Sequence, residues 1–263
     1  MEASMMEPGV MMAEMAWTTY QRRIRAGQPV LLPCGALEQH GPHMAMGVDF
    51  LIPTAICGAV ARRIGAVVAP PILFGYKSQP KMGGGNHFCG TTSLDGGTLC
   101  SLVRDVLREL VRHGARRIAL VNGHYENQMF TIEGIDLALR DLDVEAVRDL
   151  RIVRLEYWDF TTEETLKAVF PDGFPGFALE HAAVMETSLM LHLHPGLVDM
   201  TALPDDGPAV FPPYDIHPVR PGWVPCSGAL SRPHTASAEK GAILFDNYVD
   251  GVAAALRDEF TLG

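Results

Sequence analysis

The stretch Leu31–Asp49, which reads LLPCGALEQHGPHMAMGVD, indicates the fold class of this chain more directly than any other. Its apolar beginning ends at Cys34-Gly35, and a polar loop rich in imidazole and carboxylate follows. These polar side chains are Glu38, His40, His43 and Asp49. An apolar strand that ends in such a loop is typical of an open α/β sheet, which presents functional side chains at its carboxyl edge.

A second stretch repeats this pattern far downstream. The apolar run Ile118–Val121 ends at Asn122-Gly123, and His124 and Glu126 follow at once. Because parallel strands end at the same edge of a sheet, we expect the two polar loops to contribute to one site. Their composition indicates a metal-dependent hydrolase.

Strand-like and helix-like patterns alternate along the chain. We predict strands at Val30–Leu32, Ala66–Ala69, Ile118–Val121 and Ile152–Leu155. We predict helices at Leu51–Ile64, Leu94–His113, Glu126–Arg140, Thr162–Phe170, Leu179–Leu193 and Ser237–Phe260. Ser93 is the expected N-cap of the second of these helices. Such alternation predicts an α/β fold whose mostly parallel sheet is covered by helices on both faces.

Length and composition set further bounds. The chain has 263 residues, 48% of them hydrophobic, and no repeat or linker divides it, so we predict one domain over residues 1–263. The formal charge of −10 argues against a nucleic-acid partner, which needs a basic surface. No run of about 18 apolar residues occurs, so we predict no membrane span. The five cysteines are scattered and form no CxxC pair, which favours reduced thiols and a cytoplasmic location.

Two segments interrupt the alternation. Tyr76–Gly97 contains a triple glycine at 83–85, whose spacing matches neither GxGxxG nor a Walker loop, so we expect a tight or mobile loop rather than a phosphate site. Residues 204–233 are rich in proline, which predicts an extended arm on a neighbouring surface. We also expect residues 1–16 to be flexible.

The two polar loops together offer a ligand set for divalent metal ions. Paired metal sites combine imidazole nitrogen with carboxylate oxygen and share one carboxylate. The side chains that supply this mixture are Glu38, His40, Asp49, His124 and Glu126. The alternative is that these loop residues are only solvated, but two such clusters, each directly after an apolar strand, favour a metal site. The absence of HExxH and GxSxG argues against a zincin or a serine hydrolase.

Motifs along the whole chain resemble those of the creatininase family. In chain order they are LLPCGALEQHGPHM, GGGNHFCGTTSLDG, NGHYEN, YWDF and EHAAVMETSLML. The resemblance extends from about Trp17 to the C-terminus. It implies a single-domain α/β/α sandwich, a homohexamer, and two divalent ions per chain, Zn²⁺ and/or Mn²⁺. It also implies a small-molecule substrate and a cyclic amidohydrolase activity that converts creatinine to creatine.

The resemblance assigns roles to the ligand set residue by residue. Glu38 and His124 would bind one ion, and His40 and Glu126 would bind the other. Asp49 would bridge the two ions, and a hydroxide at the bridging position would attack the substrate carbonyl.

A carboxylate on an apolar stripe indicates a further functional layer. One face of the predicted helix consists of Leu179, Ala182, Glu186, Leu189 and Leu193. A buried carboxylate is costly unless it is paired or lies beside a metal, so we assign Glu186 to the site rather than to a solvated rim. Glu180 and His181 fall in the first turn of that helix. The near-neutral pKa of histidine suits His181 for shuttling a proton to a leaving nitrogen, and the resemblance gives it that role with Glu180 in support.

Substrate contacts follow from position and from the resemblance. Tyr125 lies within the second polar loop, and Trp158 follows the strand Ile152–Leu155 at the same edge, where an aromatic face suits a planar guanidine-like ring. Core packing explains Trp158 equally well on the sequence alone. Three expected pocket positions depart from the family pattern. Where the family has Ser, Trp and Asp, this chain has Met82, Phe177 and Ala178.

These departures leave more than one functional hypothesis. The chain hydrolyses creatinine, or it uses the same machinery on a different small cyclic amide, a formamide or a cyclic sugar-derived ketone. A third hypothesis is a non-catalytic binding or assembly protein, against which the intact ligand set and His181 argue. We prefer creatinine, because the segment GGGNHFCGTTSLDG is more similar to creatininases than to the wider family.

Overall fold

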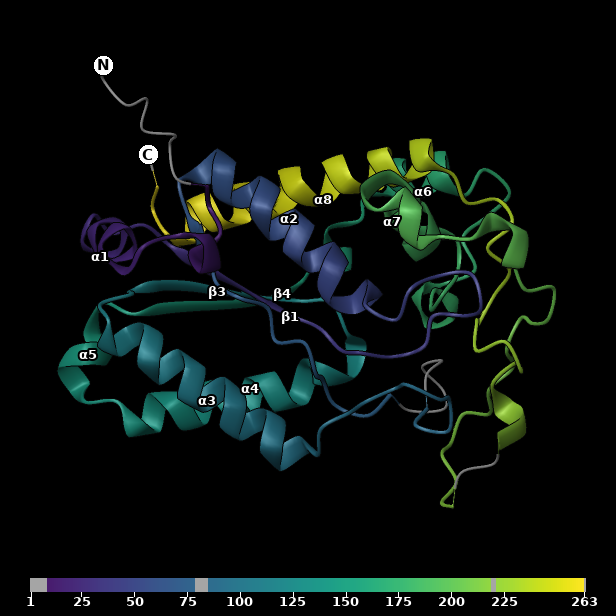
Figure 1. Ribbon diagram of the computed structural model, residues 1–263, viewed down its shortest axis with the longest axis horizontal. Coiled ribbons are helices and arrows are strands. Elements are labelled where there is room, and N and C mark those ends of the chain that lie inside the picture. Colours follow the sequence, from purple (N-terminus) through teal and green to yellow (C-terminus); the bar gives the residue numbers. More distant parts are fainter. Residues whose placement is uncertain (1–8, 79–84, 219–220, 263) are drawn as a thin grey trace.

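The structure, a computed structural model, describes residues 9–78, 85–218 and 221–262. In these residues it contains a sheet of four parallel strands in the order β2-β1-β3-β4 (Figure 1). The strands are β1 (Val30–Cys34), β2 (Val67–Val68), β3 (Arg117–Asn122) and β4 (Arg151–Glu156). All four predicted strands are confirmed, with bounds that differ by one or two residues.

Helices cover both faces of the sheet (Figure 1). The helices on one face are α2 (Val48–Ile64), α7 (Val184–Leu193) and α8 (Ala238–Glu259). Those that contribute to the opposite core are α1 (Trp17–Arg25), α3 (Gly96–Arg112) and α4 (Gln128–Asp141). Two shorter helices are α5 (Val144–Arg148) and α6 (Glu163–Val169). The 3₁₀ helices are η1 (Met12–Glu14), η3 (Tyr125–Asn127), η4 (Tyr157–Phe160), η5 (Phe177–Leu179), η6 (Pro195–Leu197), η7 (Met200–Ala202) and η8 (Pro221–Trp223).

Side chains alternate between two apolar cores along each central strand. In β3, Ala119 and Val121 belong to the core beneath α2 and α8, whereas Ile118 and Leu120 belong to the core above α3 and α4. All four side chains are fully buried. A strand buried on both faces is a continuous apolar run in the sequence, which is why the apolar pattern identified it. The three layers confirm the predicted α/β/α sandwich.

The predicted helix Leu179–Leu193 is wrong in its first part, because α7 begins only at Val184. Ala182 has a φ of +53°, in the left-handed region that interrupts a right-handed helix. The carboxylate of Glu186 accepts a hydrogen bond from the Ala182 N–H at 2.6 Å, so a polar side chain stabilises this turn of the backbone. Apolar periodicity cannot detect a break of this kind.

Two expectations that depended on this helix change with it. Leu179 and Ala182 share no helix face with Glu186, since both precede α7. Glu180 and His181 lie in the irregular segment before α7 rather than in its first turn, and Glu186 occupies the first turn instead. The side chain of Glu186 is only 16% exposed.

Three helices show smaller differences from the sequence pattern. Helix α3 begins after Asp95 rather than after Ser93, whose hydroxyl donates to Asn86 Oδ1 at 2.9 Å. Helix α1 was not predicted; its only buried side chains are Tyr20 and Ile24. The five-residue helix α5, which has no buried residue, was also not predicted.

The N-terminal residues and the proline-rich segment both contact the body of the domain. Residues 9–16 lie at the edge of the sheet, where the Val68 N–H donates to Val10 O at 2.9 Å; the rest of the predicted flexible segment, residues 1–8, lies outside the described residues. The proline-rich segment 204–233 lies against the loop before α7, since the Leu230 N–H donates to His181 O at 3.0 Å.

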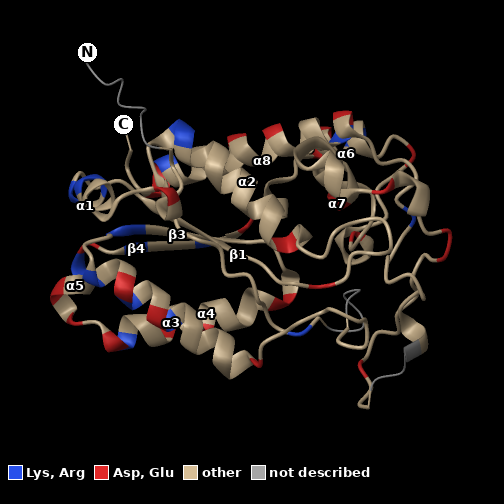
Figure 2. Cartoon of the chain, viewed as in Figure 1, with Lys and Arg blue, Asp and Glu red and all other residues tan. Residues whose placement is uncertain are grey.

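Charged residues are spread along the helices, several basic ones lie near α1, α5 and the adjoining ends of the strands, and a few acidic ones lie near the opposite ends of the strands (Figure 2). Within the described ranges, no helix is both long enough and apolar enough to cross a membrane.

Candidate active site

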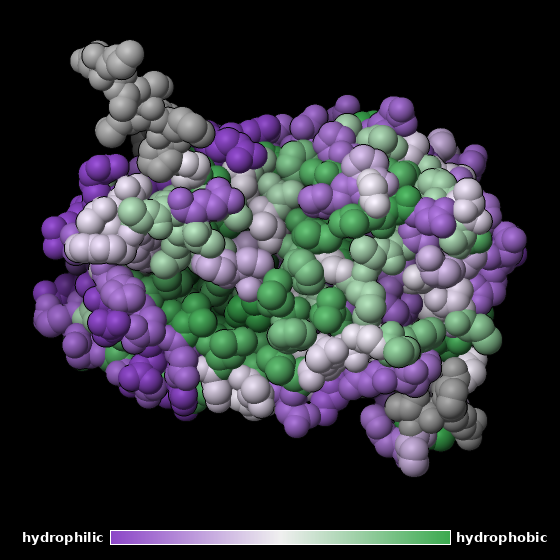
Figure 3. Space-filling model, viewed as in Figure 1, coloured by the Kyte–Doolittle hydropathy of each residue, from purple (hydrophilic) through white to green (hydrophobic). Residues whose placement is uncertain are grey.

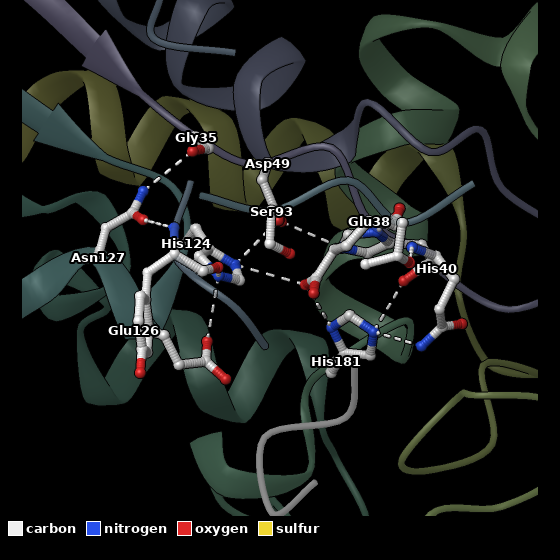
Figure 4. Close-up of polar contacts among 12 residues, drawn as sticks. Gly35, Glu38, His40, Asp49, Ser93, His124, Glu126, Asn127 and His181 are labelled. Carbon is white, nitrogen blue, oxygen red and sulfur yellow. Dashed lines mark hydrogen bonds and ion pairs between the residues drawn. The ribbon is translucent and has the colours of Figure 1, made fainter. Parts of the chain in front are cut away.

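The carboxyl ends of β1 and β3 adjoin at the centre of the sheet. The chain leaves β1 toward β2 on one side and continues to β3 on the other, so the crevice between β1 and β3 is the switch point at which α/β sheets bind ligands. Glu38 and His40 follow β1, and His124 and Glu126 follow β3. The two polar loops therefore meet at one edge of the sheet (Figure 4).

Two glycines let the beginning of α2 approach this edge closely. Gly35 and Gly123 are the first residues after β1 and β3, and a Cβ at these positions would lie 2.4 and 2.2 Å, respectively, from the carbonyl oxygen of Asp49. No larger residue fits there unless the backbone moves. Asp49, in the first turn of α2, thereby reaches the space between the two polar loops.

Asp49 lies between the two histidines (Figure 4). Its Oδ1 is 3.1 Å from His40 Nε2, and its Oδ2 is 3.1 Å from His124 Nδ1. Glu38 Oε1 lies 3.4 Å from the same His124 nitrogen. Each of these four side chains is at most 4% exposed, so the ionisable groups contact one another away from water.

Each histidine uses its other ring nitrogen to contact a main-chain carbonyl. His40 Nδ1 lies 3.2 Å from Glu38 O, and His124 Nε2 lies 3.0 Å from Tyr76 O. A carbonyl oxygen only accepts, so these nitrogens carry the proton and fix the rings, as the second nitrogen of a metal-binding histidine usually does. The nitrogens that remain for a ligand are the two that face Asp49.

Burial and opposite charges act against each other in this cluster. Burial lowers the pKa of His40, but the carboxylates of Asp49 and Glu186 raise that pKa well above its ordinary value. Burial also lowers the pKa of His124, and neighbouring glutamates raise it well above its ordinary value. The pKa of Asp49 is raised by burial, yet the two imidazoles lower it to about 2. A divalent cation that binds these atoms would displace the imidazole protons.

Three buried atoms of the cluster, Glu38 Oε2, His40 Nε2 and Asp49 Oδ2, form no hydrogen bond of good geometry within the described part of the chain. His40 Nε2 and Asp49 Oδ2 have the ion-pair contacts of 3.1 Å given above. Buried polar atoms are nearly always satisfied, so a group of unpartnered ones indicates a ligand site. Imidazole nitrogen and carboxylate oxygen are ligand atoms that zinc and manganese accept. These residues therefore fit a divalent metal ion.

The ligand atoms form overlapping groups whose members lie within 4.8 Å of one another. One group joins Glu38, Asp49 and His124, and a second joins His40, Asp49 and Glu186. Asp49 is common to both groups, which is the position that the resemblance gives to the bridging residue.

Glu126 lies on the other side of His124 (Figure 4). Its Oε2 is 3.4 Å from His124 Nε2, whereas Asp49 faces Nδ1 of the same ring. Glu186 Oε2, by contrast, lies 3.7 Å from His40 Nε2. The structure thus places Glu186 beside His40, and Glu126 belongs to none of the metal-compatible groups found in the described residues.

His181 contacts the cluster from the segment before α7. Its Nδ1 lies 3.5 Å from Glu38 Oε1, and its ring centroid is 4.4 Å from that of His40. These three residues form a third group of potential ligand atoms. Burial lowers the pKa of His181, and the neighbouring His40 lowers it further. A lowered pKa leaves the imidazole neutral at neutral pH, which suits a group that accepts a proton and then passes it on.

Glu180 is buried next to His181. Its Oε2 accepts a hydrogen bond from the Met185 N–H at 2.8 Å, and its Oε1 has no partner among the described residues. Burial raises the pKa of Glu180 to about 8. The carboxyl group therefore holds its proton at neutral pH and can donate a hydrogen bond.

A pocket of about 450 Å³ opens beside the cluster. Four of the expected substrate contacts line it, namely Tyr125, Trp158, Phe177 and Ala178. Its wall also includes apolar and aromatic side chains from Tyr157, Met185, Leu189 and Tyr248. Tyr125 is 53% exposed and Phe177 is 45% exposed, so both lie at the rim. The fifth expected contact, Met82, lies outside the described residues.

Two asparagines that the sequence reasoning did not single out hold the loops around His124. Asn127 Nδ2 donates to Gly35 O at 2.9 Å, and Asn127 Oδ1 accepts from the Tyr76 N–H at 2.8 Å. Asn122 Nδ2 donates to His124 O at 2.7 Å. Both asparagines are fully buried. Their signal in the sequence is their position on either side of His124, since a polar amide at a strand end commonly bonds to nearby backbone.

Two other residues of the stretch Leu31–Asp49, His43 and Cys34, are buried. His43 is buried, its Nε2 lies 2.9 Å from Thr187 Oγ1, and burial lowers its pKa to about 4. Burial raises the pKa of the Cys34 thiol to about 12, so this cysteine is not a nucleophile.

Among known protein families, the creatininase model, described as creatinine amidohydrolase, matches residues 13–256. The chain is 54% identical over 257 residues to the creatinine amidohydrolase of Pseudomonas putida, which covers 97% of this chain and 99% of that protein. A manganese form of creatininase superposes with a TM-score of 0.93 at 54% identity, covering 96% of this chain and 99% of the other. A zinc–zinc form of a creatininase variant superposes with a TM-score of 0.93 at 53% identity, covering 96% and 98%. The chain therefore belongs to the creatininase family.

Proposed function

We propose that this chain is a metal-dependent cyclic amidohydrolase that converts creatinine to creatine. The observation that carries the proposal is the position of Asp49, whose two carboxylate oxygens contact His40 and His124 in a buried cluster beside a pocket. A carboxylate shared between two sets of ligands is what a two-ion site requires. The 54% identity to the creatinine amidohydrolase of Pseudomonas putida supports the same substrate.

The cluster would hold two divalent ions, zinc or manganese. The ligands on which the resemblance and the geometry agree are Glu38, His40, Asp49 and His124. Two residues compete for the place of the fifth ligand. The resemblance assigns it to Glu126, whereas the position of Glu186 beside His40 assigns it to Glu186. When bound, such ions supply a Lewis acid for an amide carbonyl and lower the pKa of a water molecule to near neutrality.

The side chains of the pocket wall would control the proton. Hydrolysis adds water across the ring C–N bond, so that a hydroxyl group joins the carbonyl carbon and a proton joins the leaving ring nitrogen. His181 lines the pocket, and its lowered pKa leaves the ring neutral at rest, so it would accept the proton that the attacking water loses and pass it to that nitrogen. Glu180, with its unpartnered Oε1 in the same wall, would donate a hydrogen bond to the substrate.

The pocket suits a small planar ring. Trp158 and Tyr125 offer aromatic faces against which a guanidine-like ring can stack. Phe177 and Ala178 replace a tryptophan and an aspartate of the family pattern, so this wall offers fewer polar partners. The apolar character of these two positions favours, as a second candidate, another small cyclic amide processed by the same cluster.

Hydrolysis of creatinine by purified protein loaded with Mn²⁺ or Zn²⁺ tests the proposal. Metal-dependent turnover of roughly 1–10³ per second is expected, and a chelator should abolish it. A panel of neutral lactams and cyclic imides measured beside creatinine identifies the second candidate. If the protein hydrolyses a compound of the panel but not creatinine, the proposed substrate is wrong and the proposed chemistry stands. If it hydrolyses no cyclic amide, the proposal is refuted.

We extend the proposal to a homohexameric assembly and a cytoplasmic location. One face of the molecule has an apolar area between the two helix layers (Figure 3). Leu73 and Phe74, on the segment after β2, are 42% and 41% exposed, and exposed apolar side chains of this kind suit a contact between subunits of a homohexamer. All five cysteines are free thiols, two of them exposed, which suits a reducing cytoplasm.

A further inference from the structure

Gln39, between two proposed metal ligands in the sequence, contacts the ring of His181. Its side-chain Nε2 lies 3.0 Å from His181 Nε2, and its main-chain oxygen lies 3.0 Å from the same nitrogen. The other ring nitrogen, Nδ1, lies 3.5 Å from Glu38 Oε1. Glu38 and His181 line the pocket and Gln39 does not, so the contacts of Gln39 leave Nδ1 as the ring nitrogen on the pocket side.

The side chain of Gln39 is itself held in one orientation. Its Oε1 accepts a hydrogen bond from the Gly41 N–H at 2.8 Å, and its Nε2 donates to Gly228 O at 3.0 Å. These two bonds distinguish the oxygen from the nitrogen of the amide, so the group that faces His181 is an N–H donor. Gln39 is only 7% exposed, so little space remains for another conformation.

The proline-rich segment supplies the frame for this contact. Gly228 has a φ of +84°, and a Cβ there would lie 2.0 Å from Gln39 Oε1, so only glycine fits against the amide. In the same segment, the Leu230 N–H donates a hydrogen bond to His181 O at 3.0 Å. One segment therefore holds both the amide of Gln39 and the main chain of His181.

We propose that Gln39 is a positioning residue that holds the imidazole of His181 with Nδ1 toward the pocket. This inference rests on the proposed function, because it takes His181 as the proton donor. The Gln39 amide N–H donates to Nε2 when that nitrogen is unprotonated, and Nε2–H donates to Gln39 O when it carries a proton, so Gln39 restrains the ring in either state. Loss of the amide would misplace Nδ1 by a distance that matters for proton transfer. We expect loss of the amide to lower kcat about 10- to 100-fold and to leave KM and the metal content nearly unchanged.

Two substitutions remove the contact in different ways. Gln39→Met keeps the length of the side chain without the amide, and Gln39→Asn keeps the amide but shortens its reach by about 1.5 Å. Thr91→Val is the matched control, because the Thr91 hydroxyl accepts a hydrogen bond from the main-chain N–H of Gln39 at 3.0 Å. The control perturbs the same residue at its backbone, and we expect its kcat to stay within about two-fold of the parent.

A double-mutant cycle separates positioning from general structural support. If Gln39 acts through His181, Gln39→Met should have no further effect on kcat in a protein that already carries His181→Asn. An equal loss in both backgrounds, or loss of metal from Gln39→Met and Gln39→Asn alike, would overturn the inference.

The ¹⁵N signals of the His181 ring in zinc-loaded protein provide a readout that needs no turnover. They are identified as the imidazole signals of the parent protein that are missing from the spectrum of His181→Asn. We expect them to move in both Gln39 variants and to stay in place in Thr91→Val, even if the parent protein does not hydrolyse creatinine. Signals that stay unchanged in the Gln39 variants would refute the positioning role, whereas shifted signals without creatinine turnover would refute only the proposed substrate.

Discussion

Replacing Gly123 with alanine should disturb the proposed metal site through the backbone alone. A Cβ at Gly123 would lie 2.2 Å from Asp49 O and 2.6 Å from Pro53 Cγ, whereas ordinary van der Waals contact begins at 3.4 Å. The beginning of α2 and the loop after β3 must therefore separate by about 1.2 Å, the difference between 3.4 and 2.2 Å. Asp49 and His124 lie on opposite sides of this contact, so their 3.1 Å approach should lengthen by a similar amount.

A separation of this size is large for a metal site. Ligand distances in such sites hold to about 0.2 Å, and a misplacement of about 1 Å can cost on the order of 10²-fold in rate. We therefore expect Gly123→Ala to bind zinc at least about 10-fold more weakly and to lose on the order of 10²-fold in kcat.

Gly97→Ala is the matched control for this experiment. A Cβ at Gly97, in α3, meets nothing within 4 Å, and alanine favours a helix over glycine by up to about 1 kcal/mol. Calorimetric zinc titration, elemental analysis after gel filtration and creatinine turnover are measured on both variants. The reasoning fails if Gly123→Ala matches Gly97→Ala in zinc affinity and in kcat.

Three further predictions concern the proton donor, the buried acid and the metal. His181→Asn should lower kcat by on the order of 10²-fold while elemental analysis finds the zinc content unchanged; loss of zinc would make His181 a ligand instead. Burial raises the pKa of Glu180 from an ordinary 4.5 to about 8, so between these values the folded carboxyl keeps a proton that the unfolded one has lost. The unfolding free energy of chelator-treated protein should therefore fall as the pH rises from about 4.5 to 8, and Glu180→Gln should flatten that fall in denaturant titrations. Removal of metal should lower Tm, because a ligand that binds only the folded state stabilises it, and an unchanged Tm would count against the site.

The central strands β1 and β3 could be predicted because they are buried on both faces. Strand β3 has alternate residues in two apolar cores, which makes a run of apolar letters that needs no partner to be recognised. The start of α7 could not be predicted in this way. There the side-chain oxygens of Glu180 and Glu186 accept hydrogen bonds from main-chain N–H groups, so the chain path depends on contacts that periodicity does not represent.

The composition of the site could be predicted, but its arrangement could not. Histidines and carboxylates after two apolar runs identified the residues of the cluster. Sequence spacing does not reveal that Gly35 and Gly123 admit the backbone of Asp49, or that Glu186 lies beside His40. These relations arise from contacts between segments that are far apart in the chain.

Anomalous diffraction at the zinc absorption edge, from crystals of zinc-loaded protein, tests the two-ion site most directly. We expect two peaks that share Asp49 as a ligand, with ligand distances of about 2.0–2.2 Å. One peak should contact Glu38 and His124, and the other should contact His40. The distances from the second peak to Glu126 and Glu186 then identify which of the two is its remaining carboxylate ligand. A single peak, or peaks that do not contact Asp49, would contradict the bridging arrangement on which the proposed hydrolysis depends.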